Sequence, residues 1–137
     1  MQLSRRAIPY TPFERQLSET TVALVSTGGV HLRSQEPYNV EGDTTYRVIP
    51  SDTPSSDLMV THEHYDHAQA DQDINCVFPI DRLRELAQSG FIKGVNADFY
   101  GMMGYTLKMG PVLEVTAPEI AQKIERSATD LVLLTGG

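Results

Sequence analysis

Two short, almost uninterrupted apolar runs are the feature that most constrains the fold of this chain. The first covers Thr20–Ser26 and the second lies within Asp130–Gly137, and each leads into a pair of glycines. Such runs are typical of strands covered on both faces, as in a parallel sheet, whereas half-exposed strands alternate apolar and polar residues. We therefore expect two buried strands, each followed by a tight glycine loop.

Helical patterns lie between these strands. Residues 79–89 place Ile80 and Leu83 on one face and stop before Gly90, a typical helix end. A second helix is expected from Thr116, with Glu119 completing a capping box. Further strands are expected over 44–49, 58–61 and 91–95, and a glycine-rich loop over 100–111.

The alternation of strands and helices predicts an α/β protein. We expect a single parallel-sheet, Rossmann-like layered domain with helices packed on the sheet, covering residues 20–137. Residues 1–19 are expected to form an extended N-terminal arm. A helix is normally expected after the closing strand, and the sequence has none there. The C-terminal part of the domain is therefore expected to be missing, which would leave apolar surface open around residues 131–134.

Composition narrows the classes of partner. The 137 residues carry a net charge of −7, and ten acids face three arginines between Glu41 and Glu85. This charge disfavours nucleic acid and anionic membranes as partners. No apolar run approaches a membrane span or a secretory signal. Cys76 is the single cysteine, so no internal disulfide forms, and we expect a cytoplasmic protein. Because Cys76 lies in an apolar stretch, we expect a buried, inert thiol.

Three of the four histidines lie within six residues, His62–His67. Imidazoles suit both zinc or iron binding and acid–base chemistry near neutral pH. We therefore predict His62, His64, His67 and Asp66 as catalytic residues, with the three histidines as a candidate metal site. Solvated histidines in a polar loop remain the alternative.

Other polar residues are candidates for supporting roles. Thr27, Gly28 and Gly29 would let a substrate carboxylate approach the backbone, and Arg47 would pair with it. A plain turn and a salt bridge to a local acid are the alternatives. Asp71, Asp73 and Asn75 would orient the histidines from behind, or would instead cap the helix near residue 79. Arg82 and Arg84 are expected on the solvated face of that helix.

Several separate segments, in order and at matching spacing, resemble one family: the selenoprotein B group of the glycine, sarcosine and betaine reductases and D-proline reductase. The resemblance runs from about residue 8 to the end of the chain. The segments are Val22–His31, Tyr46–Asp52, Ala70–Leu86 and Phe99–Gly104, the third with an Asp-x-Asn-x-x-x-Pro pattern.

The resemblance implies an oxidoreductase component of amino-acid metabolism. Members cleave a C–N bond reductively, using a selenocysteine, or a cysteine in some relatives, that follows the strand ending here at Leu134. The resemblance also implies a pyruvoyl-containing partner subunit and a thiol or thioredoxin-type reductant. Homo-oligomers are a further expectation. We expect the selenocysteine after Gly137, because its codon is normally read as a stop. The chain as given would then be inactive alone.

Two other functions are alternatives to a reductase component. The pattern His-x-His-x-Asp-His is similar to the metal motif of the metallo-β-lactamase superfamily, which would make the chain a metal-dependent hydrolase. However, no histidine follows His67 and no glycine pair follows the motif. The second alternative is a non-catalytic subunit that stabilises a larger complex.

Overall fold

The computed structural model describes residues 10–137. The predicted N-terminal arm, residues 1–19, lies partly outside this range and stays a prediction; its last residues, Leu17–Glu19, form the 3-10 turn η2. Among the described residues, no helix is both long and apolar enough to cross a membrane.

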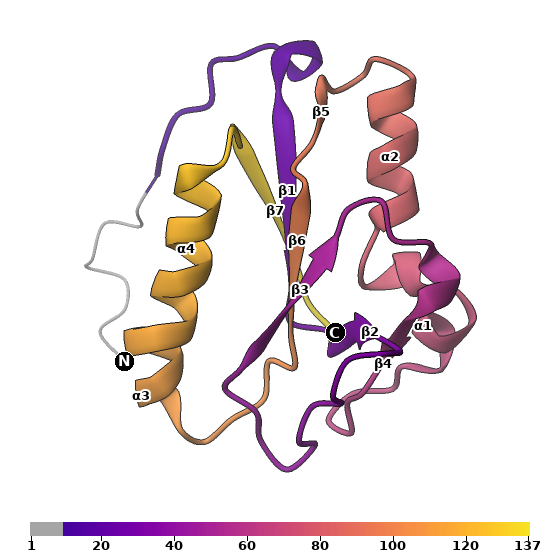
Figure 1. Cartoon of the computed structure of the whole chain (residues 1–137), viewed down its shortest axis with the longest axis vertical. Helices are drawn as coiled ribbons and strands as arrows, with labels where there is room; N and C mark the ends of the chain where they lie inside the picture. Colours follow the sequence, from indigo (N-terminus) through magenta and orange to yellow (C-terminus); the bar gives the residue numbers. More distant parts are fainter. Residues whose placement is uncertain (1–9) are drawn as a thin grey trace.

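A five-stranded sheet forms the centre of the protein (Figure 1). Strand β1 (Thr21–Ser26) lies in the middle, and it pairs in parallel with β7 (Leu131–Thr135) on one side. On the other side it pairs in parallel with β5 (Gly94–Val95) and then β6 (Asp98–Met102). Both apolar runs predicted from sequence are thus strands, and they are neighbours.

The sheet is mixed, so the prediction of a purely parallel sheet is wrong. Strand β3 (Tyr46–Pro50) pairs with β6 in the antiparallel direction. Strand β4 (Leu58–Val60), expected as part of the main sheet, instead pairs antiparallel with β2 (Val30–Leu32) in a separate two-stranded sheet. The pattern of apolar residues predicts which side chains are buried, but not the direction of a strand or its pairing partner. The direction of β3 and the partner of β4 were therefore predicted wrongly. The Rossmann-like part of the prediction is not confirmed.

The loop predicted over 100–111 is wrong for its first three residues, because β6 extends to Met102. The short helix α1 (Ala68–Gln72) and the 3-10 turns η3 (Ser55–Asp57) and η4 (Ile74–Cys76) follow or precede β4. Helix α2 (Ile80–Gln88) confirms the helix predicted over 79–89.

The second predicted helix begins earlier than Thr116. A turn, α3 (Met109–Pro111), continues through the π-helical η5 (Val112–Thr116) into α4 (Ala117–Arg126). The capping box is wrong because Thr116 is already helical, and its hydroxyl donates to the carbonyl of Thr44. Glu119 instead accepts a hydrogen bond from the Tyr46 hydroxyl, 3.1 Å away.

Helices lie on both sides of the sheet, α2 on one and α4 on the other (Figure 1). The α2 side holds the main core, whose largest fully buried side chains include Phe78, Phe99, Leu24, Ile49 and Ile80. The α4 side is packed less completely. The closing strand β7 is not buried as predicted, since Leu134 is 73% exposed on that side and Val132 is 37% exposed.

Candidate functional site at the carboxyl ends of β1 and β7

The carboxyl ends of β1 and β7 are tied together by hydrogen bonds. The Thr27 amide donates to the Thr135 carbonyl at 3.0 Å. The Val77 carbonyl accepts from two hydroxyls, those of Ser26 at 2.9 Å and Thr135 at 2.6 Å. Residues that follow parallel strands meet at this edge of a sheet, where ligands of α/β proteins commonly bind.

Gly29 turns the chain out of β1 and toward the histidine segment. Its φ of 76° lies in the left-handed region that favours glycine. Its carbonyl accepts from the Thr61 amide at 2.9 Å, and a Cβ at this position would lie 2.6 Å from the Thr61 carbonyl oxygen. The loops after Ser26, Thr61 and Leu134 therefore meet, although Thr61 arrives from the smaller sheet.

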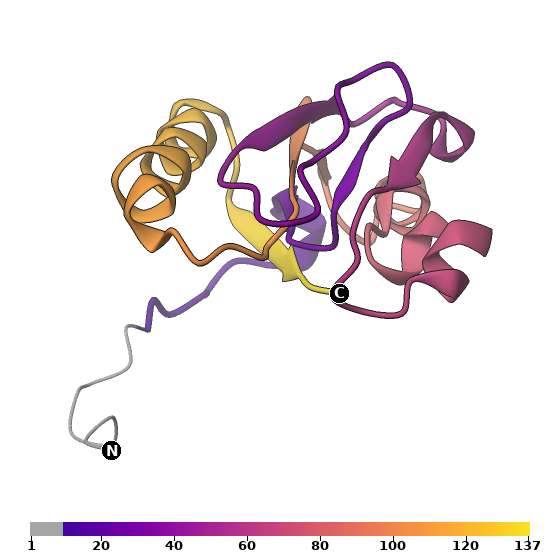
Figure 2. The ribbon, with the colours of Figure 1, turned by 90° about the horizontal axis from the view of Figure 1, so that it is seen from below.

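Tyr65 stands at the centre of this meeting point. Its hydroxyl donates to the Gly28 carbonyl at 2.7 Å. Its ring lies against Gly137, where an added Cβ would come within 2.4 Å of the ring carbon Cε1. Figure 2 shows the end of the chain after β7 on the side of the histidine segment and α1. Burial, and then the charge of Asp71, raises the pKa of Tyr65, which keeps the phenol protonated.

His62 is buried beside Tyr65, with ring centroids 4.6 Å apart. Its Nδ1 accepts from the His64 amide at 2.9 Å. Burial, followed by the charge of His64, lowers the pKa of His62. Because the ring is buried and its Nδ1 is used by the His64 amide, His62 forms a wall of the site.

His64 and His67 point to different partners. His64 stacks on Tyr105, with centroids 3.5 Å apart, and its Nε2 donates to the Val40 carbonyl at 2.8 Å. His67 Nδ1 lies 2.8 Å from an Asp71 carboxylate oxygen. Within residues 10–137, we find no partner for His67 Nε2. His67 is thus the histidine that is both oriented by a carboxylate and open to a ligand.

The arrangement does not fit the predicted metal site. Nowhere in residues 10–137 do three His, Cys, Asp or Glu side chains group closely enough to hold a metal ion. Asp66, predicted to join the histidines, accepts from the Ala68 amide at 3.0 Å and holds the start of α1. Zinc or iron stays a prediction that these contacts do not support, and the metal-dependent hydrolase loses its ligand set.

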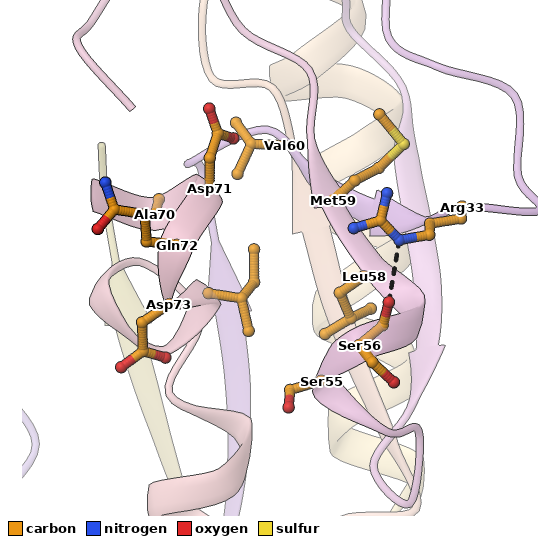
Figure 3. A pocket seen from close by; sticks show the side chains of 11 residues that line it. Arg33, Ser55, Ser56, Leu58, Met59, Val60, Ala70, Asp71, Gln72 and Asp73 are labelled. Carbon is orange, nitrogen blue, oxygen red and sulfur yellow. Dashed lines mark hydrogen bonds between the residues drawn. The ribbon is translucent and has the colours of Figure 1, made fainter. Parts of the chain in front are cut away.

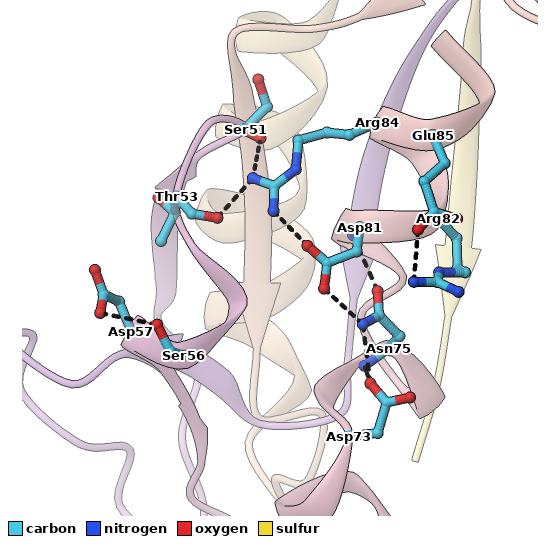
Figure 4. A network of polar contacts seen from close by, with 10 residues as sticks. All are labelled: Ser51, Thr53, Ser56, Asp57, Asp73, Asn75, Asp81, Arg82, Arg84 and Glu85. Carbon is cyan, nitrogen blue, oxygen red and sulfur yellow. Dashed lines mark hydrogen bonds and ion pairs between the residues drawn. The ribbon is translucent and has the colours of Figure 1, made fainter. Parts of the chain in front are cut away.

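The acids behind the histidines divide into two groups. Asp71 accepts from His67 Nδ1 at 2.8 Å, whereas Asp73 accepts from the Asn75 amide at 3.0 Å and caps η4. Asn75 in turn accepts from the Asp81 amide and donates to the Asp81 carboxylate, both at 2.9 Å (Figure 4). For Asp73 and Asn75 the contacts therefore favour the structural alternative.

The predicted carboxylate site is also occupied by internal contacts. The amides of Gly28 and Gly29 donate to the Ser26 hydroxyl and the Met102 carbonyl, so only the Thr27 side chain faces solvent. Arg47 donates to the Glu36 carbonyl and the Thr45 hydroxyl. Its guanidinium also lies over the Tyr38 ring. A substrate role for these residues stays a prediction.

Two of the remaining expectations fail, and one functional candidate was overlooked. Cys76 is exposed, not buried, because its turn η4 directs Val77 into the core in its place. Arg84 is not solvated, since it donates to the carbonyls of Ser51 and Thr53 (Figure 4). Tyr65 was passed over in the sequence, although an aromatic residue inside the histidine motif was a visible signal.

Comparison with known proteins identifies the family. The model of the glycine/sarcosine/betaine reductase selenoprotein B family matches residues 2–137, nearly the whole chain. The chain belongs to this family. The resemblance seen in the sequence is thereby confirmed. No solved structure gives a significant match.

Individual relatives agree with the family match. The D-proline reductase subunit gamma of Acetoanaerobium sticklandii is 43% identical over 128 residues, which cover 93% of this chain and 53% of the relative. The glycine reductase complex component B subunit gamma of Carboxydothermus hydrogenoformans is 29% identical over 134 residues, covering 93% and 30%. The betaine reductase complex component B subunit beta of Peptoclostridium acidaminophilum is 28% identical over 127 residues, covering 88% and 29%. This chain therefore spans about half the length of the first relative and less of the others.

Proposed function

We propose that this chain forms part of a reductase subunit that cleaves a C–N bond of an amino acid or related amine. The reaction site would be the meeting point of Gly28, Tyr65 and Gly137. The observation that carries the proposal is the contact of the Gly137 backbone with the Tyr65 ring. A residue that followed Gly137 would be delivered beside Tyr65, His62 and the glycine loop.

A selenocysteine, or a cysteine, is proposed directly after Gly137. Such a group supplies a nucleophile that bonds to the substrate carbon as the C–N bond breaks and the amine takes up a proton, after which an external dithiol gives two electrons and releases the reduced product. This chain would bind and orient the substrate beside that position.

We assign a separate role in the reaction to each of three surrounding side chains. Tyr65 keeps its phenol protonated and holds the glycine loop through the Gly28 carbonyl. His67, held by Asp71, would give a proton to the leaving amine, a general-acid role that imidazole commonly takes in enzymes. His62, neutral and buried, excludes water from one side of the site.

The DNA sequence beyond the codon for Gly137 tests the proposal directly. We expect an in-frame codon of the selenocysteine type, a continuing reading frame and a selenocysteine insertion element. A cysteine codon in a continuing frame would also support the site. Any other codon, or no continuing frame, would remove the nucleophile and overturn the proposal.

Activity of the longer product gives a second test. His67→Gln in that product is expected to lower the rate of D-proline cleavage by about 10²–10⁴-fold, the usual contribution of a general acid. His64→Gln serves as the matched control, because the His64 ring is stacked on Tyr105 and its Nε2 donates to the Val40 carbonyl. Equal rates for both variants would contradict the assignment of His67.

A non-catalytic role within a complex is the second candidate, and one observation favours it. An apolar groove of about 330 Å³ lies open between α4 and β7, lined by residues that include Ile120, Ile124, Val132 and Leu134. Open apolar grooves of this kind mark protein interfaces. Partners in this proposal are other reductase subunits, including one with a pyruvoyl group, a thiol or thioredoxin-type reductant, and a second copy of the chain. The location proposed for the complex is the cytoplasm.

Sedimentation velocity separates these partners. A chain that forms concentration-dependent dimers, which Leu134→Lys disperses, would assign the groove to a second copy. A chain that stays monomeric alone and associates only with the pyruvoyl-containing subunit would assign it to that partner. A monomer that binds neither contradicts the interface role.

A further inference from the structure

A cavity of about 450 Å³ lies beside the candidate site, between the η3–β4 segment and the α1–η4 segment (Figure 3). Its volume falls in the range of small-molecule sites, about 300–1,000 Å³. Asp71, which orients His67, belongs to its lining. The cavity therefore adjoins the reaction site through one shared residue.

Arg33 forms one wall of this cavity, and its guanidinium is held at one edge only. Its Nε donates to the Ser56 carbonyl at 2.9 Å, which fixes the orientation of the fork (Figure 3). Among residues 10–137, no acceptor pairs with its two terminal nitrogens. Arg47 and Arg84, in contrast, donate to several protein oxygens. A fixed guanidinium with two open N–H edges is suited to a planar carboxylate.

Asp71 lies on the opposite wall, and one of its carboxylate oxygens has no donor among the described residues. Its other oxygen is used by His67. Asp73, on the same wall, is already used by Asn75. Arg33 and Asp71 do not form an ion pair with one another, so opposite charges face a shared cavity without neutralising each other.

Four buried apolar side chains also line the cavity. They are Leu58, Val60, Ala70 and Ile74, each no more than 8% exposed. An apolar floor of this kind suits a small hydrocarbon body and excludes large, strongly hydrated ions. The cavity thus presents a cation, a carboxylate and an apolar surface to one ligand.

We propose that this cavity binds a small amino acid as its zwitterion, with the ligand carboxylate on Arg33 and the ligand ammonium on the open oxygen of Asp71. The site rests on its own geometry, but the choice of an amino acid as ligand rests on the proposed function. Because Asp71 also holds His67, an ammonium on Asp71 competes for the same carboxylate. Occupancy of the cavity is therefore coupled to the histidine that faces the reaction site.

Titration of the ¹⁵N-labelled chain with D-proline tests the site by amide chemical shifts. We expect saturable shifts at Leu58, Ala70 and Gln72, with a dissociation constant in or near the range of about 1 μM to 1 mM that is usual for metabolites. Arg33→Gln is expected to weaken binding roughly tenfold or more, the effect of losing one charge-assisted contact. The matched control is Arg82→Gln, which removes the same charge from an arginine that forms an exposed ion pair with Glu85 on α2.

Cyclopentanecarboxylate, which has the ring and the carboxylate but no amine, tests the Asp71 contact. We expect it to bind more weakly than D-proline by roughly tenfold, and Asp71→Asn should remove this difference. Equal binding of the two ligands to the unaltered chain would contradict the zwitterion. Undiminished binding to Arg33→Gln, or no saturable shift at about 50 mM D-proline, far above the usual metabolite range, would overturn the site.

Binding of D-proline to the cavity can be measured independently of reductase activity. Binding by shift titration needs no redox residue, so saturable binding with no continuing reading frame would support the cavity and refute the reductase. A continuing frame with no binding would do the reverse. Thermal melts of Arg33→Gln show whether the variant is folded, and Arg33→Lys, which keeps the charge but not the fork, gives an intermediate affinity if the geometry matters.

Discussion

The ring of Tyr65 lies directly against the backbone of Gly137, while the Tyr65 hydroxyl donates to the Gly28 carbonyl at 2.7 Å. One side chain thus joins the loop after β1 to the end of the chain after β7. The contact also brings the histidine segment to the same place. It makes Tyr65 the residue on which the geometry of the candidate site depends.

Tyr65→Phe should loosen this junction without unfolding the protein. The variant keeps the ring but removes a half-buried hydrogen bond to Gly28, which contributes about 0.5–1.5 kcal/mol to the free energy of unfolding. We expect a loss of that size in urea denaturation, with faster amide exchange confined to residues 27–29. Unchanged exchange in that loop would mean that the hydroxyl does not hold it.

Gly29 and Gly90 offer a matched test of close packing, because both have a φ of 76°. An added Cβ at Gly29 would lie 2.6 Å from the Thr61 carbonyl oxygen, whereas nothing lies within 4 Å at Gly90. Gly90→Ala should lose about 1 kcal/mol from backbone strain alone. Gly29→Ala should lose several kcal/mol more, since the backbone of Thr61 must move. Equal losses in chemical denaturation would contradict the close approach of the two segments.

Local sequence patterns predict several elements of the fold. The runs that became β1 and β7 and the 3.6-residue pattern of α2 are properties of neighbouring residues, so the sequence alone predicts them. Strand direction and partner are different, since they depend on where distant segments meet. The residues of β3 do not by themselves specify that this strand runs antiparallel to β6. Those of β4 do not specify that it pairs with β2.

The candidate site shows the same limit. The sequence singled out the histidine segment, and the structure places it at the carboxyl ends of β1 and β7. However, the sequence alone does not show whether Arg33 or Arg47 is free to bind a ligand, because this depends on contacts with residues distant in the chain. Arg47 is engaged with Glu36, Thr45 and Tyr38, whereas Arg33 keeps an open fork.

Arg84 should contribute more to stability than its neighbour Arg82. Arg84 joins the carbonyls of Ser51 and Thr53 to the Asp81 carboxylate, and its side chain is 25% exposed (Figure 4). Charge-assisted hydrogen bonds of this kind are worth about 1.5–3 kcal/mol. Arg84→Gln should lose roughly that amount from the free energy of unfolding.

Arg82→Gln is the control, because Arg82 is 60% exposed and its one ion pair within residues 10–137 is with Glu85, at 2.7 Å. Exposed ion pairs contribute about 0–1 kcal/mol. The two variants, compared in the same urea titration, therefore separate the network that joins α2 to the β3–η3 loop from ordinary surface charge. A loss for Arg82→Gln as large as that for Arg84→Gln would show that the network contributes nothing of its own.

Acid should destabilise the protein through its buried histidines. Burial is the main cause that lowers the pKa of His31 and of His62 from 6.5. At a pH between the lowered value and 6.5, the unfolded chain binds protons that the folded chain does not. The free energy of unfolding must therefore rise with pH in this window, reach its full value above 6.5, and fall as the pH drops toward the folded pKa values.

His31 should account for much of this slope, because its ring is fully buried. Its Nδ1 donates to the Leu32 carbonyl at 2.8 Å, so its Nε2 accepts from the Thr61 hydroxyl at 2.7 Å. A second proton on Nε2 would require the Thr61 hydroxyl to turn from donor to acceptor and would place a positive charge in the core. His31→Gln should lower stability at every pH and also flatten its dependence on pH below 6.5. Urea titrations across this range measure the slope separately from the overall loss, and a slope as steep as that of the unaltered chain would assign the acid sensitivity to other groups.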